Sequence, residues 1–202
     1  MVRIKICGIC DAAGAEAAVE AGADLLGFHF CSSPRQVSPE EARVIVEGLA
    51  VRPKIVGVFI DEDAGEVRQI ADYVDLDIVQ LHGSEAPGFD PGRPVIKVLK
   101  VRDGHVPEAG GWPDPLMLDS WSADQRGGTG RSWDWELARP LLSTRRVFFA
   151  GGLEPGNVGK VVSAYRPFGV DVSSGVEAAI RVKDPEKLRA FITAVRLAEA
   201  AI

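Results

Sequence analysis

The chain has 202 residues, 46% of them hydrophobic and 26% charged, which suits one soluble globular domain with a sizeable core. Its formal charge of −6 gives no electrostatic reason to expect nucleic acid or an anionic membrane as a partner. No apolar run reaches the ~18 residues of a membrane span, and we expect no signal peptide because charged and apolar residues alternate in the first residues.

Short runs of apolar and β-branched residues recur along the chain, and several are nearly continuous, as strands covered on both faces are. We predict eight strands, at Val2–Cys7, Leu25–Phe30, Ile55–Ile60, Ile78–Leu81, Val95–Leu99, Leu116–Asp119, Val147–Ala150 and Gly169–Val172. Their starts lie roughly 17 to 31 residues apart, which is the spacing of strand-helix units.

Most of the intervening segments have helix signals. Ser38-Pro39-Glu40-Glu41, for example, combines an N-cap serine, a proline at the first helical position and acidic residues in the first turn. We predict helices at Asp11–Ala21, Ala42–Ala50, Asp63–Val74, Asp134–Leu142 and Asn157–Tyr165, and a last helix from Asp184-Pro185-Glu186 to about Ala201.

Two connections are rich in proline and glycine. We expect a short helix in residues 84–93 and none in residues 102–115. Strands that alternate with helices form a parallel sheet, because each crossover needs a helix-sized connection. We therefore predict an α/β fold in which a single domain, residues 1–202, forms a (β/α)8 TIM barrel. An open doubly wound sheet is the alternative.

In such barrels the functional groups lie at the carboxyl ends of the strands. Polar residues gather at several of the predicted ends, although strand ends also meet solvent and are polar for that reason alone. The candidates are Cys7 after the first strand, Asp61 after the third, Gln80 and His82 at the fourth, Asp119 at the sixth and Asp171 at the eighth.

The ends of the last two strands predict a phosphate site. Gly151-Gly152 and Ser173-Ser174-Gly175 offer bare backbone N–H groups and hydroxyls, and loops after the seventh and eighth strands often bind phosphate in barrels. We expect residues Val176–Ile180 to form a short helix whose N-terminus points at the anion. The alternative is that these glycines only make turns.

The cysteines indicate a reducing compartment. Cys7, Cys10 and Cys31 are too few and too clustered for a disulfide framework, so we expect a cytoplasmic protein. Cys7-Gly8-Ile9-Cys10 has the C-x-x-C spacing of redox and zinc sites, but the sequence has no second pair to complete four zinc ligands. A dithiol or zinc-binding module is therefore the weaker alternative, and we expect no metal and no cofactor.

Eight motifs occur in order along the chain. They are Lys5-Ile6-Cys7-Gly8-Ile9, Gly27-Phe28-x-Phe30, Ser33-Pro34-Arg35, Gly57-Val58-Phe59, Val79-Gln80-Leu81-His82-Gly83, Leu118-Asp119 with Gly127-Gly128-Thr129-Gly130 and Asp134-Trp135, Gly151-Gly152-Leu153, and Asp171-Val172-Ser173-Ser174-Gly175-Val176-Glu177. Together they resemble phosphoribosylanthranilate isomerase, the enzyme of tryptophan biosynthesis that rearranges an aminoaldose into an aminoketose. The resemblance runs from Arg3 to the last helix.

This resemblance implies a (β/α)8 barrel whose fifth helix is reduced or missing, acting on a phosphorylated small molecule, N-(5-phosphoribosyl)anthranilate. It implies Cys7 as the general base and Asp119 as the general acid. It implies that Arg35 binds a carboxylate of the substrate and that Asp171 also binds the substrate. The residues that it implies for the phosphate are Gly151, Gly152, Ser173, Ser174 and Gly175.

Both groups of the acid/base pair need tuned pKa values. We expect Lys5, two residues before Cys7 on the same strand face, to favour the thiolate. Asp171 is the candidate carboxylate that raises the pKa of Asp119. We interpret His29 and His105 as structural or exposed, and leave the roles of Gln80 and His82 open.

A same-fold alternative is an isomerase of the related histidine-pathway substrate, or a dual-specificity enzyme. Those relatives are expected to carry Asp where Cys7 stands, which disfavours them. Three departures from the family pattern are Cys10, where Thr is usual, a segment between Phe30 and Arg35 that is one residue shorter than in some relatives, and Trp133, where Phe is common. We expect a monomer or a homodimer.

Overall fold

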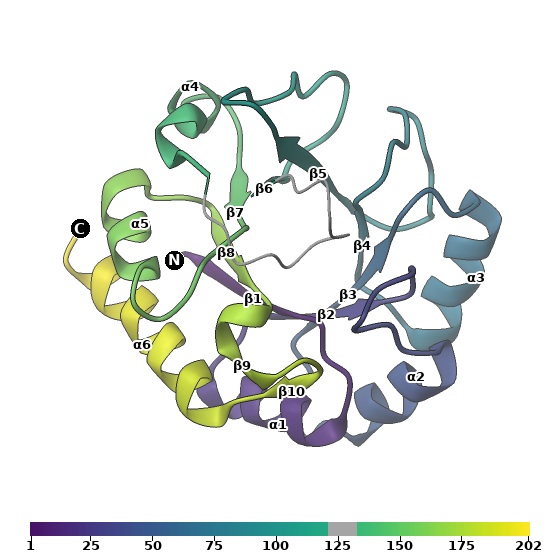
Figure 1. The fold of residues 1–202 in the computed structure, drawn as a ribbon. Helices are drawn as coiled ribbons and strands as arrows, with labels where there is room; N and C mark the ends of the chain where they lie inside the picture. The colour runs from purple at the N-terminus through teal and green to yellow at the C-terminus, as the bar shows by residue number, and fades with distance from the viewer. Residues whose placement is uncertain (121–132) are drawn as a thin grey trace.

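The computed structural model describes residues 1–120 and 133–202 of the chain (Figure 1). Eight parallel strands form a closed barrel in chain order, and β8 pairs with β1 to close it. The strands are β1 Arg3–Cys7, β2 Leu25–His29, β3 Lys54–Phe59, β4 Ile78–Leu81, β5 Val95–Val101, β6 Leu116–Ser120, β7 Val147–Phe149 and β8 Gly169–Val172. The predicted barrel is confirmed, with strand bounds that differ from the prediction by one or two residues at some ends.

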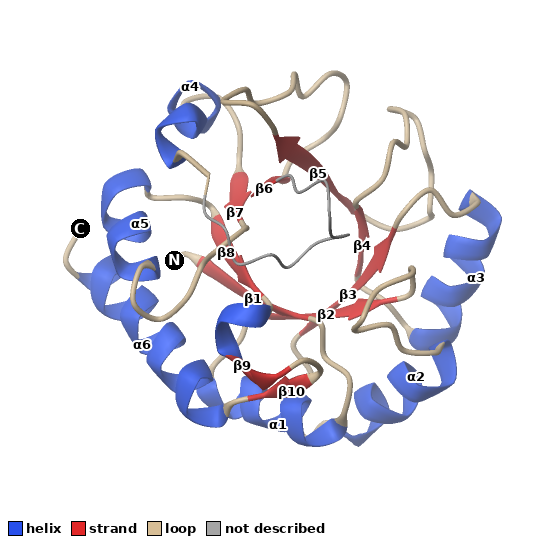
Figure 2. Ribbon diagram, in the orientation of Figure 1, coloured by secondary structure: helices blue, strands red, loops and turns tan. Residues whose placement is uncertain are grey.

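The helices lie outside the ring of strands (Figure 2). They are α1 Ala12–Ala21, α2 Pro39–Gly48, α3 Ala64–Val74, α4 Arg139–Leu142, α5 Val158–Tyr165 and α6 Pro185–Ala200, and a 3-10 turn, Trp135–Ala138, precedes α4. Ser38 and Glu41 form the capping box that starts α2. After β8 the chain makes the 3-10 turn Ser174–Val176 and the hairpin of β9 Glu177–Ala179 and β10 Val182–Lys183.

Residues 102–115, all of which are described, contain no helix, which confirms the prediction for the connection between β5 and β6. The short helix predicted in residues 84–93 is wrong, because that described segment forms turns instead. The Glu85 side chain holds the start of this segment against the barrel. It accepts hydrogen bonds from the N–H groups of Asp61 and Gly83 and pairs with Lys97 at 2.5 Å.

The helix predicted at Val176–Ile180 is also wrong. The only helical turn in this described segment comes earlier, at Ser174–Val176, and the chain then becomes β9. Glu177 points its carboxylate at two buried cations, and Arg181 takes the positive φ of 74° that turns β9 into β10. An extended, tightly turned segment satisfies these contacts, so the helix-dipole part of the predicted phosphate site does not form.

Two apolar clusters pack on the two faces of the barrel wall. The large cluster lies between strands and helices, and Ile4, Leu26 and Phe149 belong to it. A smaller cluster fills the inside: Leu25, Val56, Ile96, Val98, Met117, Phe148 and Ala150. Residues two apart on a strand share a face, and Met117 faces the interior. Asp119 therefore also faces the interior, one layer nearer the carboxyl end of the strand.

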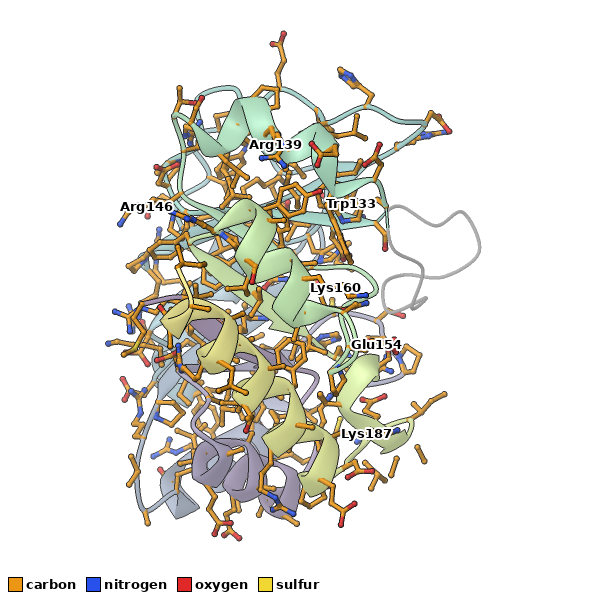
Figure 3. The ribbon with its side chains drawn as sticks, turned by 90° about the vertical axis from the view of Figure 1, so that its left-hand side faces the viewer. Trp133, Arg139, Arg146, Glu154, Lys160 and Lys187 are labelled. Atoms are coloured by element: carbon orange, nitrogen blue, oxygen red, sulfur yellow. The ribbon has the colours of Figure 1, made fainter. Side chains whose placement is uncertain are left out.

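All eight strands point the same way, so their carboxyl ends meet at one end of the barrel. In Figure 3, Arg146, just before β7, lies on the left side of the molecule, and Glu154, a few residues after β7, lies on the right side. Among the described residues no helix has the length and apolarity needed to cross a membrane.

Candidate active site

A pocket opens at the carboxyl ends of the barrel strands. It is lined by Cys7, His29, Cys31, Ser33, Arg35, Val58, Ile60, Gln80, His82, Asp119, Asp171 and Ser173. Five of the predicted site residues, Cys7, Arg35, Asp119, Asp171 and Ser173, therefore meet in one place. They come from both ends and the middle of the chain, and the closure of the barrel brings them together.

Lys5 lies one layer beneath the pocket and is fully buried, with Nζ 2.8 Å from Asp171 Oδ1. Burial opposes its charge, but the Asp171 carboxylate and the Cys7 thiol outweigh burial and raise the pKa of Lys5. Gly27 makes room for this group, because a Cβ there would lie 2.9 Å from both Lys5 Nζ and Cys7 Sγ. Lys5 is therefore a permanent cation beside the thiol.

Cys7 is 4% exposed at the end of β1. Burial raises the pKa of its thiol, and Asp171 adds to that rise, while Lys5 and Lys183 act in the opposite direction. The prediction that Lys5 favours the thiolate is thus confirmed in direction, but burial has the larger effect. The Cys7 sulfur also has a polar partner, since His29 Nε2 lies 3.3 Å from it.

Asp119 ends β6 and is 9% exposed. Burial and the neighbouring Asp171 raise its pKa to about 6, against the opposing hydrogen bonds of Ser120 and the charge of Lys100. The predicted role of Asp171 in this shift is confirmed as the second cause. His82 Nε2 lies 3.5 Å from Asp119 Oδ2, and burial followed by nearby lysines lowers the pKa of His82 to about 3, so the ring is neutral.

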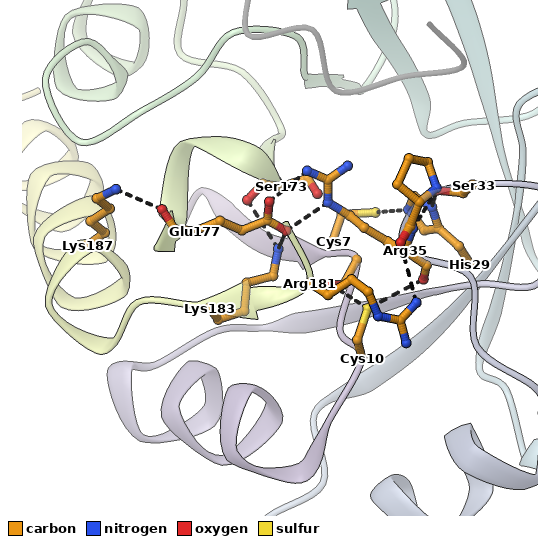
Figure 4. A network of polar contacts seen from close by, with 12 residues as sticks. Cys7, Cys10, His29, Ser33, Arg35, Ser173, Glu177, Arg181, Lys183 and Lys187 are labelled. Atoms are coloured by element: carbon orange, nitrogen blue, oxygen red, sulfur yellow. Dashed lines mark hydrogen bonds and ion pairs between the residues drawn. The ribbon is translucent and has the colours of Figure 1, made fainter. Parts of the chain in front are cut away.

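Arg35 is 6% exposed and is held by a buried carboxylate (Figure 4). Its Nε and Nη2 atoms donate to Glu177 at 2.7 and 2.6 Å. Lys183 Nζ donates to the same carboxylate at 3.0 Å and to the backbone oxygen of Ser173 at 3.1 Å. Among the described residues Arg35 Nη1 has no hydrogen bond or ion pair, whereas Nε and Nη2 are both bound to Glu177.

The two glycine loops predicted to bind phosphate lie against each other. A Cβ on Gly175 would be 2.1 Å from the backbone oxygen of Leu153, so the loop after β8 touches the loop after β7. Gly151 and Gly152 have φ values of 80° and 76°, a backbone conformation that favours glycine. A Cβ on Gly151 would also be 2.6 Å from the Ser120 backbone nitrogen. Ser174 begins the 3-10 turn between Ser173 and β9.

Two buried polar atoms of the pocket have no partner within the described part of the chain, Ser173 Oγ and Gln80 Oε1. Leaving a buried polar atom unpaired costs about 1–3 kcal/mol, so these two pocket atoms are candidates for hydrogen bonds to a ligand or to water. In residues 1–120 and 133–202 no group of three or more His, Cys, Asp and Glu side chains is arranged to hold a metal ion.

Comparison with known proteins places this site in a family. A family model described as N-(5'phosphoribosyl)anthranilate (PRA) isomerase matches residues 4–194. The chain belongs to this family. The N-(5'-phosphoribosyl)anthranilate isomerase of Pelobacter propionicus is 46% identical over 197 residues, which cover 95% of this chain and 94% of that protein.

Solved phosphoribosylanthranilate isomerases have the same fold. The structure from Thermus thermophilus is 39% identical with a TM-score of 0.88, over 97% of this chain and 99% of that one. A second structure, 36% identical with a TM-score of 0.82 over 97% and 99% of the two chains, is a complex with reduced 1-(O-carboxyphenylamino)-1-deoxyribulose 5-phosphate. The resemblance found in the sequence is thus confirmed.

In this member of the phosphoribosylanthranilate isomerase family, sequence reasoning missed two features of the pocket. His29, interpreted as structural or exposed, lines the pocket beside Cys7. Strand alternation is the signal that identifies it, because Gly27 faces the interior and His29 follows it by two residues. The Glu177 contact with Arg35 joins residues 142 positions apart, and no local pattern predicts such a pair.

Proposed function

We propose that the chain converts N-(5-phosphoribosyl)anthranilate into 1-(2-carboxyphenylamino)-1-deoxyribulose 5-phosphate, a step of tryptophan biosynthesis, by general acid/base catalysis. The observation that carries the proposal is one pocket lined by a thiol from β1 and a carboxyl group from β6 whose pKa is raised to about 6. The two proton transfers of this rearrangement need an acid and a base that face one substrate.

Asp119 supplies the acid. A carboxyl group with a pKa of about 6 retains a proton in a useful fraction of molecules near neutral pH, which an ordinary aspartic acid does not. The protonated group donates to the ring oxygen of the ribose as the C1–O bond breaks, and the nitrogen lone pair forms an iminium at C1. The product of this step is an open-chain cation with Asp119 ionised.

Cys7 supplies the base. Its thiolate removes the proton from C2, and the C–H electron pair forms the C1–C2 double bond of an enolamine while the iminium is neutralised. The enolamine then tautomerises to the ketose. No oxidant or reductant is consumed, and the two side chains carry both protons, so the proposed reaction needs neither metal nor organic cofactor. Each such group typically contributes ~10²–10⁴-fold.

The remaining predicted residues bind the two ends of the substrate. Arg35 Nη1 offers a donor to the anthranilate carboxylate, because Glu177 occupies the other two donors of its fork. The glycine and serine loops after β7 and β8 hold the phosphate through backbone N–H groups and hydroxyls, in the position where barrels often do so. The unpaired Ser173 hydroxyl supports this assignment.

The cysteines support a cytoplasmic location, because Cys7, Cys10 and Cys31 are all free thiols. Whether the protein is a monomer or a homodimer stays a prediction, as does the single-domain assignment of residues 1–202.

The test is a fluorescence assay that follows consumption of phosphoribosylanthranilate with a metal chelator present throughout. We expect turnover by the wild-type chain, and none by Cys7→Ser with its circular dichroism unchanged. Lack of wild-type turnover overturns the proposal, and normal turnover by Cys7→Ser removes the thiol from the mechanism. The histidine-pathway aminoaldose serves as a second substrate, and faster turnover of it favours the alternative isomerase.

A further inference from the structure

His29 stands between the proposed base and a loop that carries the proposed anthranilate-binding arginine. Its Nε2 lies 3.3 Å from Cys7 Sγ, and its Nδ1 lies 2.9 Å from Ser33 Oγ. Figure 4 labels Cys7, His29 and Ser33 beside one another, and all three line the pocket. Both ring nitrogens therefore have a polar partner, and the ring cannot turn without losing both.

The loop after β2 fixes the position of the hydroxyl. The backbone N–H of Arg35 donates to Ser33 Oγ at 3.1 Å, and the N–H of Val37 donates to the His29 backbone oxygen at 3.0 Å. The Arg35 N–H fills one acceptor site of the Ser33 oxygen, and the hydroxyl is within reach to donate its proton to His29 Nδ1. In that arrangement Nδ1 accepts, and the single ring proton lies on Nε2, facing the sulfur.

The ring stays neutral because of what surrounds it. Burial, together with Lys5, His82, Arg35 and Lys183, lowers the pKa of His29 to about 3. A thiolate–imidazolium pair of the cysteine-protease type is therefore disfavoured, since it would add a cation to a site that already holds several. The groups that face Cys7 itself are Lys5, Asp171 and Lys183.

We propose that His29 is a positioning residue that holds the Cys7 thiolate with a hydrogen bond donated by its neutral Nε2–H, in a tautomer set by Ser33. The inference rests on the proposed role of Cys7 as the base. A hydrogen bond from this uncharged donor offsets part of the free-energy cost of burying the thiolate. The same hydrogen bond orients the sulfur so that a lone pair points into the pocket. No bond to His29 forms or breaks in the reaction.

The experiment measures the rate of iodoacetamide alkylation of Cys7 against pH, with peptide mass spectrometry following the Cys7 adduct alone. Changed access alters the plateau rate, whereas a changed thiol pKa moves the midpoint. For His29→Leu we expect the midpoint to rise by about one pH unit, the size expected for a hydrogen bond to a charged group. In His29→Gln, which keeps an N–H donor, the midpoint should return most of the way to the wild-type value. In the exposed-loop control His105→Leu, the midpoint should not change.

In parallel, kcat/KM of His29→Leu at pH 7 is expected to fall about tenfold, with affinity for a reduced product analogue unchanged. An unchanged or lowered midpoint in His29→Leu overturns the inference, because removing a ring that accepts a hydrogen bond from the neutral thiol would lower the midpoint. If His29→Leu does not fold, Ser33→Ala must raise the midpoint. A wild-type chain without isomerase activity refutes the proposed function instead, whatever the alkylation shows.

Discussion

Replacing Asp119 with Asn should make the protein inactive and more stable. The pKa of Asp119 is raised from 3.8 to about 6, a difference of about 2 units, and each unit corresponds to ~1.4 kcal/mol between the two protonation states. When the pKa of a group is higher in the folded state than in the unfolded state, protonation of the group stabilises the fold. This contribution is complete at pH values below the unfolded-state pKa and is lost as the pH rises through the folded-state pKa. At pH 7 the ionised carboxylate therefore costs about 3 kcal/mol, which Asn does not incur, while at pH 4 the cost is only about 0.5 kcal/mol.

The assay is urea unfolding of wild type and Asp119→Asn at several values between pH 4 and pH 8. The measured quantity is the difference in free energy of unfolding between Asp119→Asn and wild type, and it should grow by about 2–3 kcal/mol over this range. Any effect of the amide that does not depend on pH adds the same amount at every pH and therefore does not alter this growth. A difference that does not vary with pH refutes the assigned pKa. Asp77→Asn is the matched control, because the N–H of Ile55 and the charges of Lys54 and Arg52 outweigh burial and lower the pKa of Asp77. Its removal should destabilise at neutral pH, and that loss should shrink as pH falls.

Three further outcomes are expected. The active form pairs protonated Asp119 with ionised Cys7, so kcat/KM should rise with pH up to about pH 6, stay level, and fall above the raised pKa of Cys7. A profile of kcat/KM that does not rise up to about pH 6 contradicts the assigned pKa of Asp119. Gly27→Ala puts a methyl carbon 2.9 Å from the Cys7 sulfur and should lower kcat about 10²-fold, so unchanged kcat shows that the thiol position is not critical. Arg35→Ala should mainly raise KM, and a large fall in kcat at constant KM would exclude a binding role.

The barrel was predictable because its strands are covered on both faces and so appear as continuous apolar runs, such as those ending in Phe59 and Phe149. Local signals also placed α2, where Ser38 and Glu41 make the expected box. Proline and glycine content correctly removed the helix before β6. It was a poorer guide before β5, where Glu85 contacts Asp61, in the loop after β3, and Lys97, in β5, and these contacts hold the segment in turns.

The candidate site was predictable where a residue ends a strand, as Cys7 and Asp119 do. It was not predictable where a side chain acts through a distant partner. The helix expected at Val176–Ile180 failed because Glu177 reaches Arg35, and sequence spacing contains no trace of that pairing. The net pKa of the Cys7 thiol was unpredictable for a similar reason, since burial outweighs the charge of Lys5 only in the closed fold.

The closing pair of the barrel has a consequence for how the protein is made. β1 carries the proposed base, and one of its edges stays open until β8, whose residues Gly169–Val172 pair with Arg3–Ile6, has been translated. α6 then seals the seam, where Arg196 donates to the Val2 backbone oxygen at 2.7 Å. A nascent chain that stops before residue 169 thus has an unpaired strand edge and lacks Asp171 and Ser173 of the pocket, so ribosome-released fragments should be both inert and prone to aggregate.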